Sequence, residues 1–512
     1  MSLWGRIMYA IDAWRRYGYA NETEYMDAVY AQRWALYDGS AFEDALRRSP
    51  FRRGQHIKIY RNTRLLRNQI APIVDFYVAH TYAGDMSTDG KRLPDGTLGA
   101  IPIDPQTGGD ESDALLRTAI AELMTAWNWK GQMGQRPMYV TALGDCMTRL
   151  VDDGGQGMPY PELIWPGYVK DLELDFVDNV KYYVLEYRVE QRDERGRATT
   201  HLYREEVDGE SFRYFLDGAP WDRFGEGAVV PNPYGFVPAI WDRFTKVRGV
   251  RGMPATEPAR QAIMELNSFL SHAIDHQKKV FYAPLLVSGV ASRGGKREIN
   301  LTTPPTSDVS REDASEFAET FNMLPAGTDA KIAQAEFDIG QTEALLERLT
   351  QGIYESNPEA RFYPELREMS QLSAPGAERA LGDGVSRVRR LRANLDFNTV
   401  KLFQMAISMA GYRANGGGWT APLSRRQQAF VPYTLESYRD GLLDFTILDR
   451  PVLVPSEADR LDLMLLKRSL GVPDEVLWEE MGYDASEIER FRELIAEAEA
   501  RSDRAFNAGV IA

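Results

Sequence analysis

The stretch PARQAIMELNSFLSHAIDHQKKV, residues 258–280, decides how this chain is organised. Its apolar residues recur at steps of three and four, which places them on one face of an α-helix. A second helix with the same spacing is predicted from about Ile339 to Ser356, and Asn357-Pro358 ends it. The stripe of the first helix consists of Ala259, Ala262, Ile263, Leu266, Phe269, Leu270, Ala273 and Ile274.

The segment between these two helices, residues 281–337, has a different character. It holds short β-like runs, Leu285–Val287 and Glu298–Leu301, that are broken by Gly294-Gly295 and Pro304-Pro305. Two helices that leave one body and re-enter it, with a small mixed α/β module at their far end, form a stalk with a tip. A stalk helix with one apolar stripe leaves part of that stripe uncovered, so a neighbouring subunit is a natural partner.

Outward from the stalk, the periodicity predicts a mainly helical α+β protein. Residues 181–190, 201–203 and 212–215 alternate in the period of two that is typical of strands, so an antiparallel β-meander is expected at about 160–240. The Gly- and Pro-rich stretch 85–110 predicts a long exposed loop. Helices are expected at 5–37, 63–80, 113–129, 137–146, 377–411 and 455–505.

Composition limits the class of protein. The chain has 512 residues, a formal net charge of −15 and one cysteine, so more than one domain is expected. One cysteine excludes an internal disulfide scaffold and a cysteine-based zinc or iron–sulfur site. Cys146 is predicted to be a buried structural thiol. The acidic balance argues against a protein that wraps nucleic acid over its whole surface.

No targeting signal or membrane span is expected. Charges at Asp12, Arg15 and Arg16 interrupt the start before an apolar region develops. No stretch approaches the roughly 18 uncharged apolar residues that a membrane-spanning helix needs. The sequence therefore predicts an intracellular protein without a membrane partner.

Two groups of charged or titratable residues have two readings each. The basic cluster in 52–67 is either a solvated flank of the following helix or a contact for a polyanion or an acidic neighbour. His272 and His276 have the i, i+4 spacing of a metal-binding pair, but no third ligand is evident, so polar-face histidines or stem-to-stem contacts are favoured and no metal site is predicted. No catalytic constellation and no cofactor motif are found, so an enzyme is not expected.

Several stretches, taken in order, resemble a known family. They are Asn232–Pro238 (NPYGFVP), Gly252–Pro254, Glu265–Asn267, Leu324–Thr328, Ser373–Leu381 and Leu470–Glu475. As an ordered set over nearly the whole chain, they resemble a tailed-bacteriophage portal protein of the siphovirus type. Portal proteins form the ring at the unique vertex of the capsid through which DNA enters and leaves.

The resemblance implies a portal fold with wing, stem, clip and crown regions. On this chain these would be a wing at 1–254, a first stem helix at 255–280, a clip at 281–337, a second stem helix at 338–356, a tunnel loop at 357–374, a long tunnel-side helix with the wing return at 375–454, and a helical crown at 455–512. The fold would assemble as a homo-oligomeric ring, dodecameric in the virion.

The resemblance also implies partners. The ring would conduct double-stranded DNA during packaging and ejection, and it would dock the large terminase subunit and then the head–tail connector or adaptor. It would contact the major capsid and scaffolding proteins, and it would be found in the virion at the capsid vertex and in the host cytoplasm during assembly. The alternative from another class is a metal-dependent phage nuclease or hydrolase.

Site residues follow from these expected regions. Lys278, Lys279, Arg361 and Arg367 are candidates for contact with DNA in the channel, with ordinary intersubunit or solvent charges as the other reading. For partner docking at the clip, the candidates are Gly294, Gly295, Lys296 and Arg297.

Overall fold

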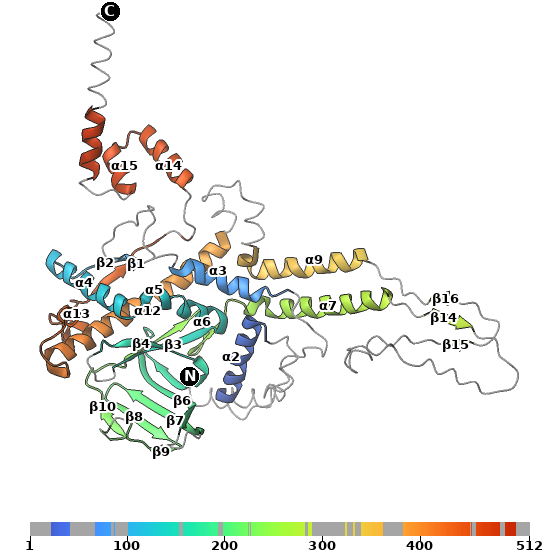
Figure 1. Cartoon of the computed structure of the whole chain (residues 1–512), viewed down its shortest axis with the longest axis horizontal. Coiled ribbons are helices and arrows are strands. Elements are labelled where there is room, and N and C mark those ends of the chain that lie inside the picture. Colours follow the sequence, from blue (N-terminus) through green and yellow to red (C-terminus); the bar gives the residue numbers. More distant parts are fainter. Residues whose placement is uncertain are drawn as a thin grey trace, which may run out of the picture. The chain divides into compact units, whose positions relative to one another are not determined.

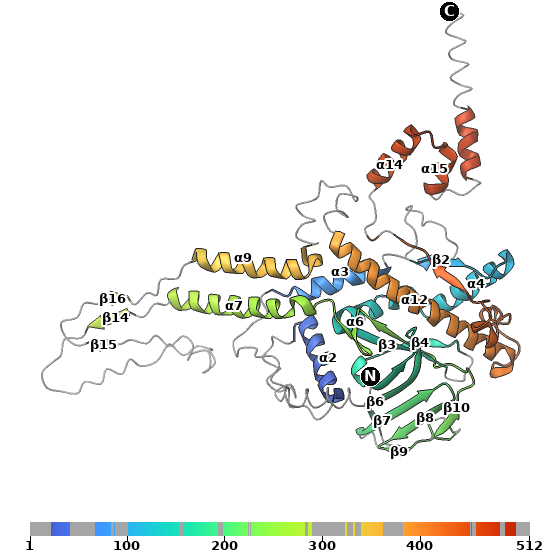
Figure 2. The ribbon, with the colours of Figure 1, turned by 180° about the vertical axis from the view of Figure 1, so that it is seen from behind.

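The computed structural model divides into two compact units, each described by itself below. The first comprises 1–56, 68–260 and 354–512, and the second comprises 57–67 and 261–353. The described residues are 22–40, 67–82, 86–87, 101–152, 157–192, 198–281 except 224 and 226, 285–288, 323–324, 331–332, 339–361, 382–450, 452, 457–481 and 487–497. Figures 1 and 2 show the chain from two opposite sides.

Helices hold more of the structure than strands do, which confirms the α+β, mainly helical class. The first unit is built around α12 (Gly382–Tyr412), most of whose residues from Leu402 to Ala410 lie in a core cluster with α4 (Asp110–Ala126) and α5 (Trp129–Gln132). Aromatic packing fixes their approach: the rings of Trp127 and Phe403 lie 4.8 Å apart between centroids. Further helices of this unit are α2 (Glu22–Asp38), α3 (Ile70–Tyr82), α6 (Gln135–Leu143) and α13 (Arg425–Gln428).

The predicted meander is a strongly twisted antiparallel sheet with the strand order β10-β8-β7-β6-β5 and β9 paired to β8. Its strands are β5 (Val169–Leu174), β6 (Val180–Arg192), β7 (Ala198–Asp208), β8 (Ser211–Leu216), β9 (Ala219–Pro220) and β10 (Val229–Pro231). The strand that contains Pro231 stands at the edge of the sheet, where a residue without an N–H is tolerated.

Smaller sheets complete the first unit. The order β11-β3-β4 joins β3 (Asp145–Val151), β4 (Tyr160–Ile164) and β11 (Ala239–Arg243), and β12 (Thr245–Arg248) pairs with β13 (Arg251–Met253). A buried ion pair connects this layer to the helices. The Arg136 guanidinium on α6 donates to both carboxylate oxygens of Asp242 on β11 at 2.6 and 2.7 Å, and to the Thr399 hydroxyl on α12 at 2.7 Å.

The second unit contains most of the two predicted stalk helices, α7 (Glu257–Phe281) and α9 (Ile339–Ser356). Both are confirmed close to their predicted bounds, and they run alongside each other in Figures 1 and 2. Between them lie β14 (Leu285–Ser288), β15 (Met323–Leu324) and β16 (Lys331–Ile332), which form a small sheet. The predicted run Glu298–Leu301 lies outside the described residues.

Asn267 on α7 anchors a distant stretch of chain within the same unit. Its side-chain oxygen accepts from the Arg67 backbone N–H at 2.9 Å, and its amide donates to the Arg67 carbonyl at 3.0 Å. The Asn267 side chain thus bonds the backbone N–H and the backbone carbonyl of one residue, as a neighbouring strand would, and it is fully buried. Apart from Arg67, the basic cluster in 52–67 lies outside the described residues.

The C-terminal helices carry exposed leucines. These helices are α14 (Glu457–Ser469), α15 (Asp474–Met481) and residues 487–497. Leu477 and Ile488 are buried, whereas six described leucines in or directly after these helices are more than half exposed. These six are Leu461, Leu463, Leu465, Leu466, Leu470 and Leu494.

Two predictions from the sequence are wrong in part. The helix expected at 137–146 ends at Leu143, because Gly144 adopts a left-handed φ of 103° and Asp145 begins β3. The stretch 85–110 is not a continuous exposed loop. It contains β1 (Met86–Ser87) and β2 (Ile101–Pro105), which pair with each other, and β2 also pairs with β17 (Phe445–Ile447), which buries Ile103.

Candidate functional site

A buried clamp ties together the two points where the helical hairpin joins the first unit. The Asn357 amide, just after α9, donates to the carbonyl of Ala255, just before α7, at 2.9 Å, and to Glu359 Oε1 at 2.6 Å. Glu359 lies in the short helix η5 (Pro358–Arg361) and is 1% exposed. The start and the return of the hairpin are therefore held at one place in the first unit.

Glu359 connects this clamp to two further helices. The Tyr77 hydroxyl on α3 donates to Glu359 Oε1 at 3.1 Å, and burial, with the nearby Glu359 charge, raises the pKa of Tyr77 well above its usual value. From α12, the Arg387 guanidinium donates to Glu359 Oε2 at 3.4 Å and to the Ser356 carbonyl at 3.1 Å. The Glu359 carboxylate therefore accepts three hydrogen bonds, from Tyr77 on α3, from Arg387 on α12 and from Asn357 just after α9. These donors compensate the cost of burying the carboxylate.

The approach to α7 is fixed by a close crossing of two backbones. A Cβ atom placed on Gly252 would lie 2.2 Å from the Gly144 carbonyl oxygen, so no side chain fits there. Beside the crossing, Asp145 Oδ2 accepts from the Gly252 N–H at 2.8 Å, and the Ala255 N–H donates to the Thr141 carbonyl at 3.1 Å. Burial raises the pKa of Asp145, although the charge of Arg251 opposes that shift.

The sequence did not reveal this clamp. It showed Asn357-Pro358 only as the end of a helix and Glu359 as one acidic residue of a charged loop. A carboxylate directly after a helix-ending Asn-Pro is a weak signal. Its burial depends on Tyr77 and Arg387, which are far away in the sequence.

Of the predicted DNA-channel residues, the structure describes only Arg361 in full. Arg361 ends η5 and is half-buried, with its guanidinium carbon 5.5 Å from the centroid of the Tyr354 ring. Lys278 and Lys279 lie in the last turns of α7, and their side chains fall outside the described part. Arg367 lies wholly outside it, so the assignment of these four residues to one channel stays a prediction.

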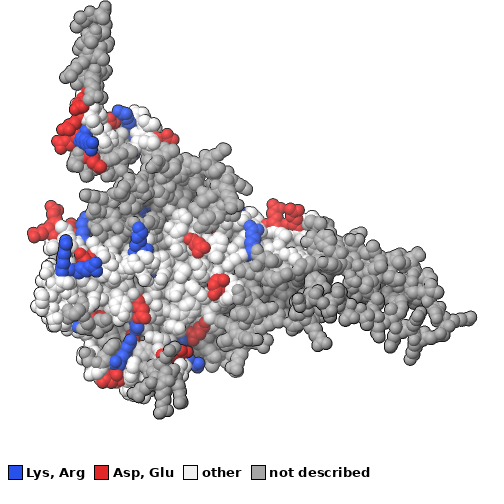
Figure 3. All heavy atoms as spheres, viewed as in Figure 1, with Lys and Arg blue, Asp and Glu red and all other residues white. Residues whose placement is uncertain are grey.

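The predicted clip residues Gly294, Gly295, Lys296 and Arg297 also lie outside the described residues. On α12, in contrast, Arg389 and Arg390 are fully described and exposed. In the face drawn in Figure 3, the basic and acidic side chains of the described residues are interspersed and do not gather into a single charged field.

The remaining titratable residues were weighed for chemistry. Burial raises the pKa of the Cys146 thiol well above its usual value, as expected for a structural cysteine in β3. His272 is exposed on α7, and the side chain of His276 is not described. Within the described ranges no three or more His, Cys, Asp or Glu residues are grouped to hold a metal ion, and no described helix is long and apolar enough to cross a membrane.

No protein-family model matches the chain, and a search of curated proteins finds no match.

Proposed function

We propose that this chain is the subunit of a phage portal, a homo-oligomeric ring that conducts double-stranded DNA at one vertex of a capsid. The observation that carries the proposal is the helical hairpin: α7 and α9 depart from and return to one buried clamp, and they enclose residues 282–338. This is the arrangement that the resemblance assigns to a stem that bears a clip. Terminase, the connector, and the capsid and scaffolding proteins would then be partners of the assembled ring.

The uncovered apolar surface supports assembly. Leu465 and Leu470 on the C-terminal helices are 63% and 76% exposed. On the hairpin, Phe269 and Leu270 are half-buried and Leu345 on α9 is 40% exposed. Side chains of this size gain about 1.5–3 kcal/mol each when they are fully buried. Contacts between unlike surfaces, repeated by rotation, close into a ring.

Electron microscopy of the purified chain tests the proposal. We expect rings with an axial channel wide enough for duplex DNA. Replacing Leu465 and Leu466 with Asp should reduce the yield of rings, whereas Leu202→Asp, at a 39% exposed position on β7, should leave it close to normal. A chain that stays monomeric at every salt and protein concentration would refute the proposal.

A further inference from the structure

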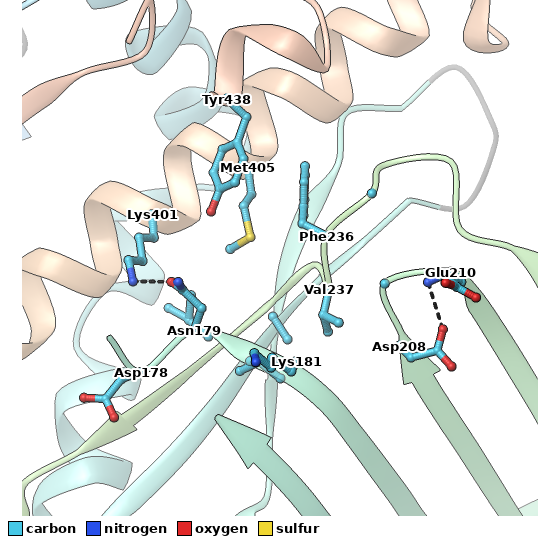
Figure 4. Close-up of a pocket in the computed structure, with 15 residues that line it drawn as sticks. Asp178, Asn179, Lys181, Asp208, Glu210, Phe236, Val237, Lys401, Met405 and Tyr438 are labelled. Atoms are coloured by element: carbon cyan, nitrogen blue, oxygen red, sulfur yellow. Dashed lines mark hydrogen bonds between the residues drawn. The ribbon is translucent and has the colours of Figure 1, made fainter. Parts of the chain in front are cut away.

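Apolar side chains of the first unit line a cleft and also cover parts of α14. The cleft, of about 450 Å³, lies beside the start of β6, and Figure 4 shows Phe236, Met405 and Tyr438 on its apolar wall. Lys181 and Glu210 also line it, so charges of both signs meet there and no single class of ligand is indicated. On α14, in contrast, the positions of the exposed leucines do indicate a partner.

The exposed leucines of α14 and its last turn form two separate stripes. At about 100° per residue, Leu463, Leu466 and Leu470 lie within about 60° of one another, at the i, i+3, i+7 spacing of a seam between helices. Leu461 and Leu465 lie within about 40° of each other on another side of the helix. The first set is called stripe A and the second stripe B, and all five side chains are between 51% and 76% exposed.

Stripe A and stripe B lie on almost opposite flanks of α14, with centres about 150° apart around the helix axis. On one side, between the stripes, lie Met464 and Lys467, which are half-buried and mark the side that the chain itself covers. On the other side, between the stripes, lie Asp462 and Ser469, which are exposed. The helix therefore has a covered inner side, a polar outer side and an apolar flank on each hand.

The turn after α14 fixes the direction of these flanks. The Val472 N–H donates to the Lys467 carbonyl at 3.2 Å, and the Gly471 N–H donates to the Arg468 carbonyl at 3.0 Å, which is the hydrogen bonding of a Schellman C-cap. The Arg468 guanidinium also pairs with the Asp474 carboxylate of α15 at 2.9 Å. Neither stripe can turn inward without breaking these contacts.

Two flanks call for two neighbours. A single partner helix lies along one side of α14 and covers one stripe, whereas stripes about 150° apart need a neighbour on each side. Along the helix axis, Leu465 and Leu466 differ in height by about 1.5 Å, and Leu461 and Leu463 by about 3 Å. Stripe A of one copy can therefore pack against stripe B of a second copy whose α14 runs in the same direction. Repeated by rotation, this one unlike-surface contact covers both flanks of every copy.

The area of the stripes favours a repeated contact over an isolated pair. Exposure of this size on five leucines leaves an apolar surface on the order of a few hundred Å², the size that marks an interaction site. A stable interface buries about 800 Å² on each partner, and one stripe supplies only part of that area. A pair held by α14 alone would be weak, whereas in a closed ring the same contact adds to the others between neighbouring subunits.

We propose that the α14 helices of neighbouring copies lie side by side in the same direction, with stripe A of each copy packed against stripe B of the next. The inference rests on the proposed ring and identifies one of its subunit contacts. It does not require that the ring conducts DNA.

Disulfide trapping between differently tagged full-length chains tests the contact. One chain carries Leu465→Cys and the other carries Leu466→Cys, and the natural thiol, Cys146, is buried. We expect a mixed disulfide between the two tags under mild oxidation, and no disulfide-linked pair from either variant alone, because like stripes do not meet. Leu461→Cys mixed with Leu463→Cys samples the same contact at another height and should also give a mixed disulfide.

Asp462→Cys mixed with Leu465→Cys is the matched control, because Asp462 is exposed on the polar outer side of the same helix. This mixture should give no mixed disulfide. Absence of a mixed disulfide from both stripe pairs overturns the proposal. Linked pairs that form equally well within a single variant also overturn it, because like stripes would then meet.

Exchange of charge across the contact gives a second measurement. Leu465→Asp or Leu466→Lys alone should lower the yield of rings about 10-fold or more, because each buries an unpaired charge against leucines. Both changes in one chain should restore the yield to within about two-fold, because the two new charges then face each other across the contact. The melting temperature should stay the same in every variant, since these side chains are exposed in the single chain. A double variant no better than the single ones would show that the stripes do not meet.

The two proposals fail separately. If rings form and the mixed disulfides are absent, only the α14 contact is rejected. If the mixed disulfides appear and microscopy shows assemblies without an axial channel, the portal proposal is rejected and the α14 contact stands.

Discussion

At the scale of single residues, the chain places a buried carboxylate with several hydrogen-bond donors where the hairpin returns. Glu359 is one carboxylate that accepts from Tyr77, Asn357 and Arg387, and therefore connects three segments that are remote in sequence. Removing a buried acceptor of this kind lowers the free energy of unfolding strongly, because each donor that it satisfies loses that partner at the same time.

Replacing Glu359 with Ala should lower the free energy of unfolding by about 2–3 kcal/mol, because in this buried site the Tyr77 hydroxyl loses its acceptor and the Asn357 amide keeps only the Ala255 carbonyl. Urea unfolding followed by circular dichroism measures the change. Glu355→Ala, at an exposed position on α9, is the control and should stay within about 0.5 kcal/mol. Equal effects of the two substitutions would show that the clamp contributes little.

Gly252 offers a second test at this scale. Gly252→Ala forces a methyl group against the Gly144 carbonyl oxygen, 2.2 Å from the ideal Cβ position, and neither backbone can move without displacing the start of α7. We expect a loss of about 3 kcal/mol. Gly352→Ala is the matched control, because nothing lies within 4 Å of its Cβ position in α9. That change should stabilise the chain by about 0.5–1 kcal/mol, as thermal unfolding would show.

At the scale of elements, α3 carries a histidine whose environment opposes its charge. Burial lowers the pKa of His80, and the positive charge of Arg392 on α12 lowers it further, against the raising effect of the Phe76 carbonyl, 2.7 Å from Nδ1. The carbonyl of His80 itself accepts from Arg392 at 3.0 Å. The packing of α3 against α12 therefore favours the neutral imidazole.

This environment predicts a pH-dependent stability of known sign. An unfolded histidine takes up its proton near pH 6.5, whereas His80 in the folded chain stays neutral to lower pH. Between those two values the unfolded state binds more protons, so the free energy of unfolding falls as the pH drops below about 6.5 and is retained above it. Urea unfolding at pH 7.5 and 5.5 should show a smaller decline for His80→Gln than for the unmodified chain.

The control for this experiment is His201→Gln, because His201 is paired with Asp217 on the meander, away from α3. It should leave the pH dependence conferred by His80 in place. An unchanged decline in the His80 variant would mean that carboxylates alone cause the acid sensitivity.

The elements differ in how far the sequence predicts them. The bounds of α7 and α9 follow from amphipathic spacing, and β6, β7 and β8 follow from alternation, because both patterns are local. The strand β3 has no alternation, since both of its faces are buried, and the helix predicted at 137–146 wrongly includes its first two residues, Asp145 and Cys146. Likewise, Ile103 in β2 is buried in a core that includes Phe445 of β17, which lies more than 300 residues later and pairs with that strand.

The same reasoning separates the parts of the candidate site. The sequence predicted where the hairpin begins and ends, because Asn357-Pro358 stops a helix locally. It could not predict that Glu359 is buried or that Gly144 and Gly252 touch, because both depend on the packing of segments that only the folded chain brings together. Tertiary contacts of this kind leave little trace in periodicity or composition.

At the scale of the whole molecule, the net charge of −15 agrees better with a channel through which DNA slides than with a protein that binds DNA firmly. A protein that neutralises many phosphates gains affinity by releasing counterions, and it holds its nucleic acid firmly. A portal that lets DNA slide needs the opposite, a mostly repulsive wall with a few basic positions.

In the portal proposal, neighbouring subunits and docking proteins contact different parts of the hairpin. If residues 281–337 form a clip, larger side chains there should weaken the binding of docking proteins more than they hinder ring closure. The reason is that α7, α9 and the C-terminal helices offer the apolar surface for neighbouring subunits. Replacing Gly294 and Gly295 with Trp should therefore leave ring counts in negative-stain images close to normal, while binding of the purified large terminase subunit to the rings falls about 10-fold or more, as when a docking surface is blocked.

Gly352→Trp is the control, because it adds one Trp side chain to α9 at a position with nothing within 4 Å of the Cβ site. It should leave terminase binding unchanged, so that a loss confined to the Gly294 and Gly295 variant locates docking in 281–337. If rings fail in that variant and the residual rings still bind terminase normally, the segment belongs to the ring contact and the clip assignment is wrong. Comparing the two variants distinguishes a surface that neighbouring subunits cover from one that stays accessible to the terminase subunit.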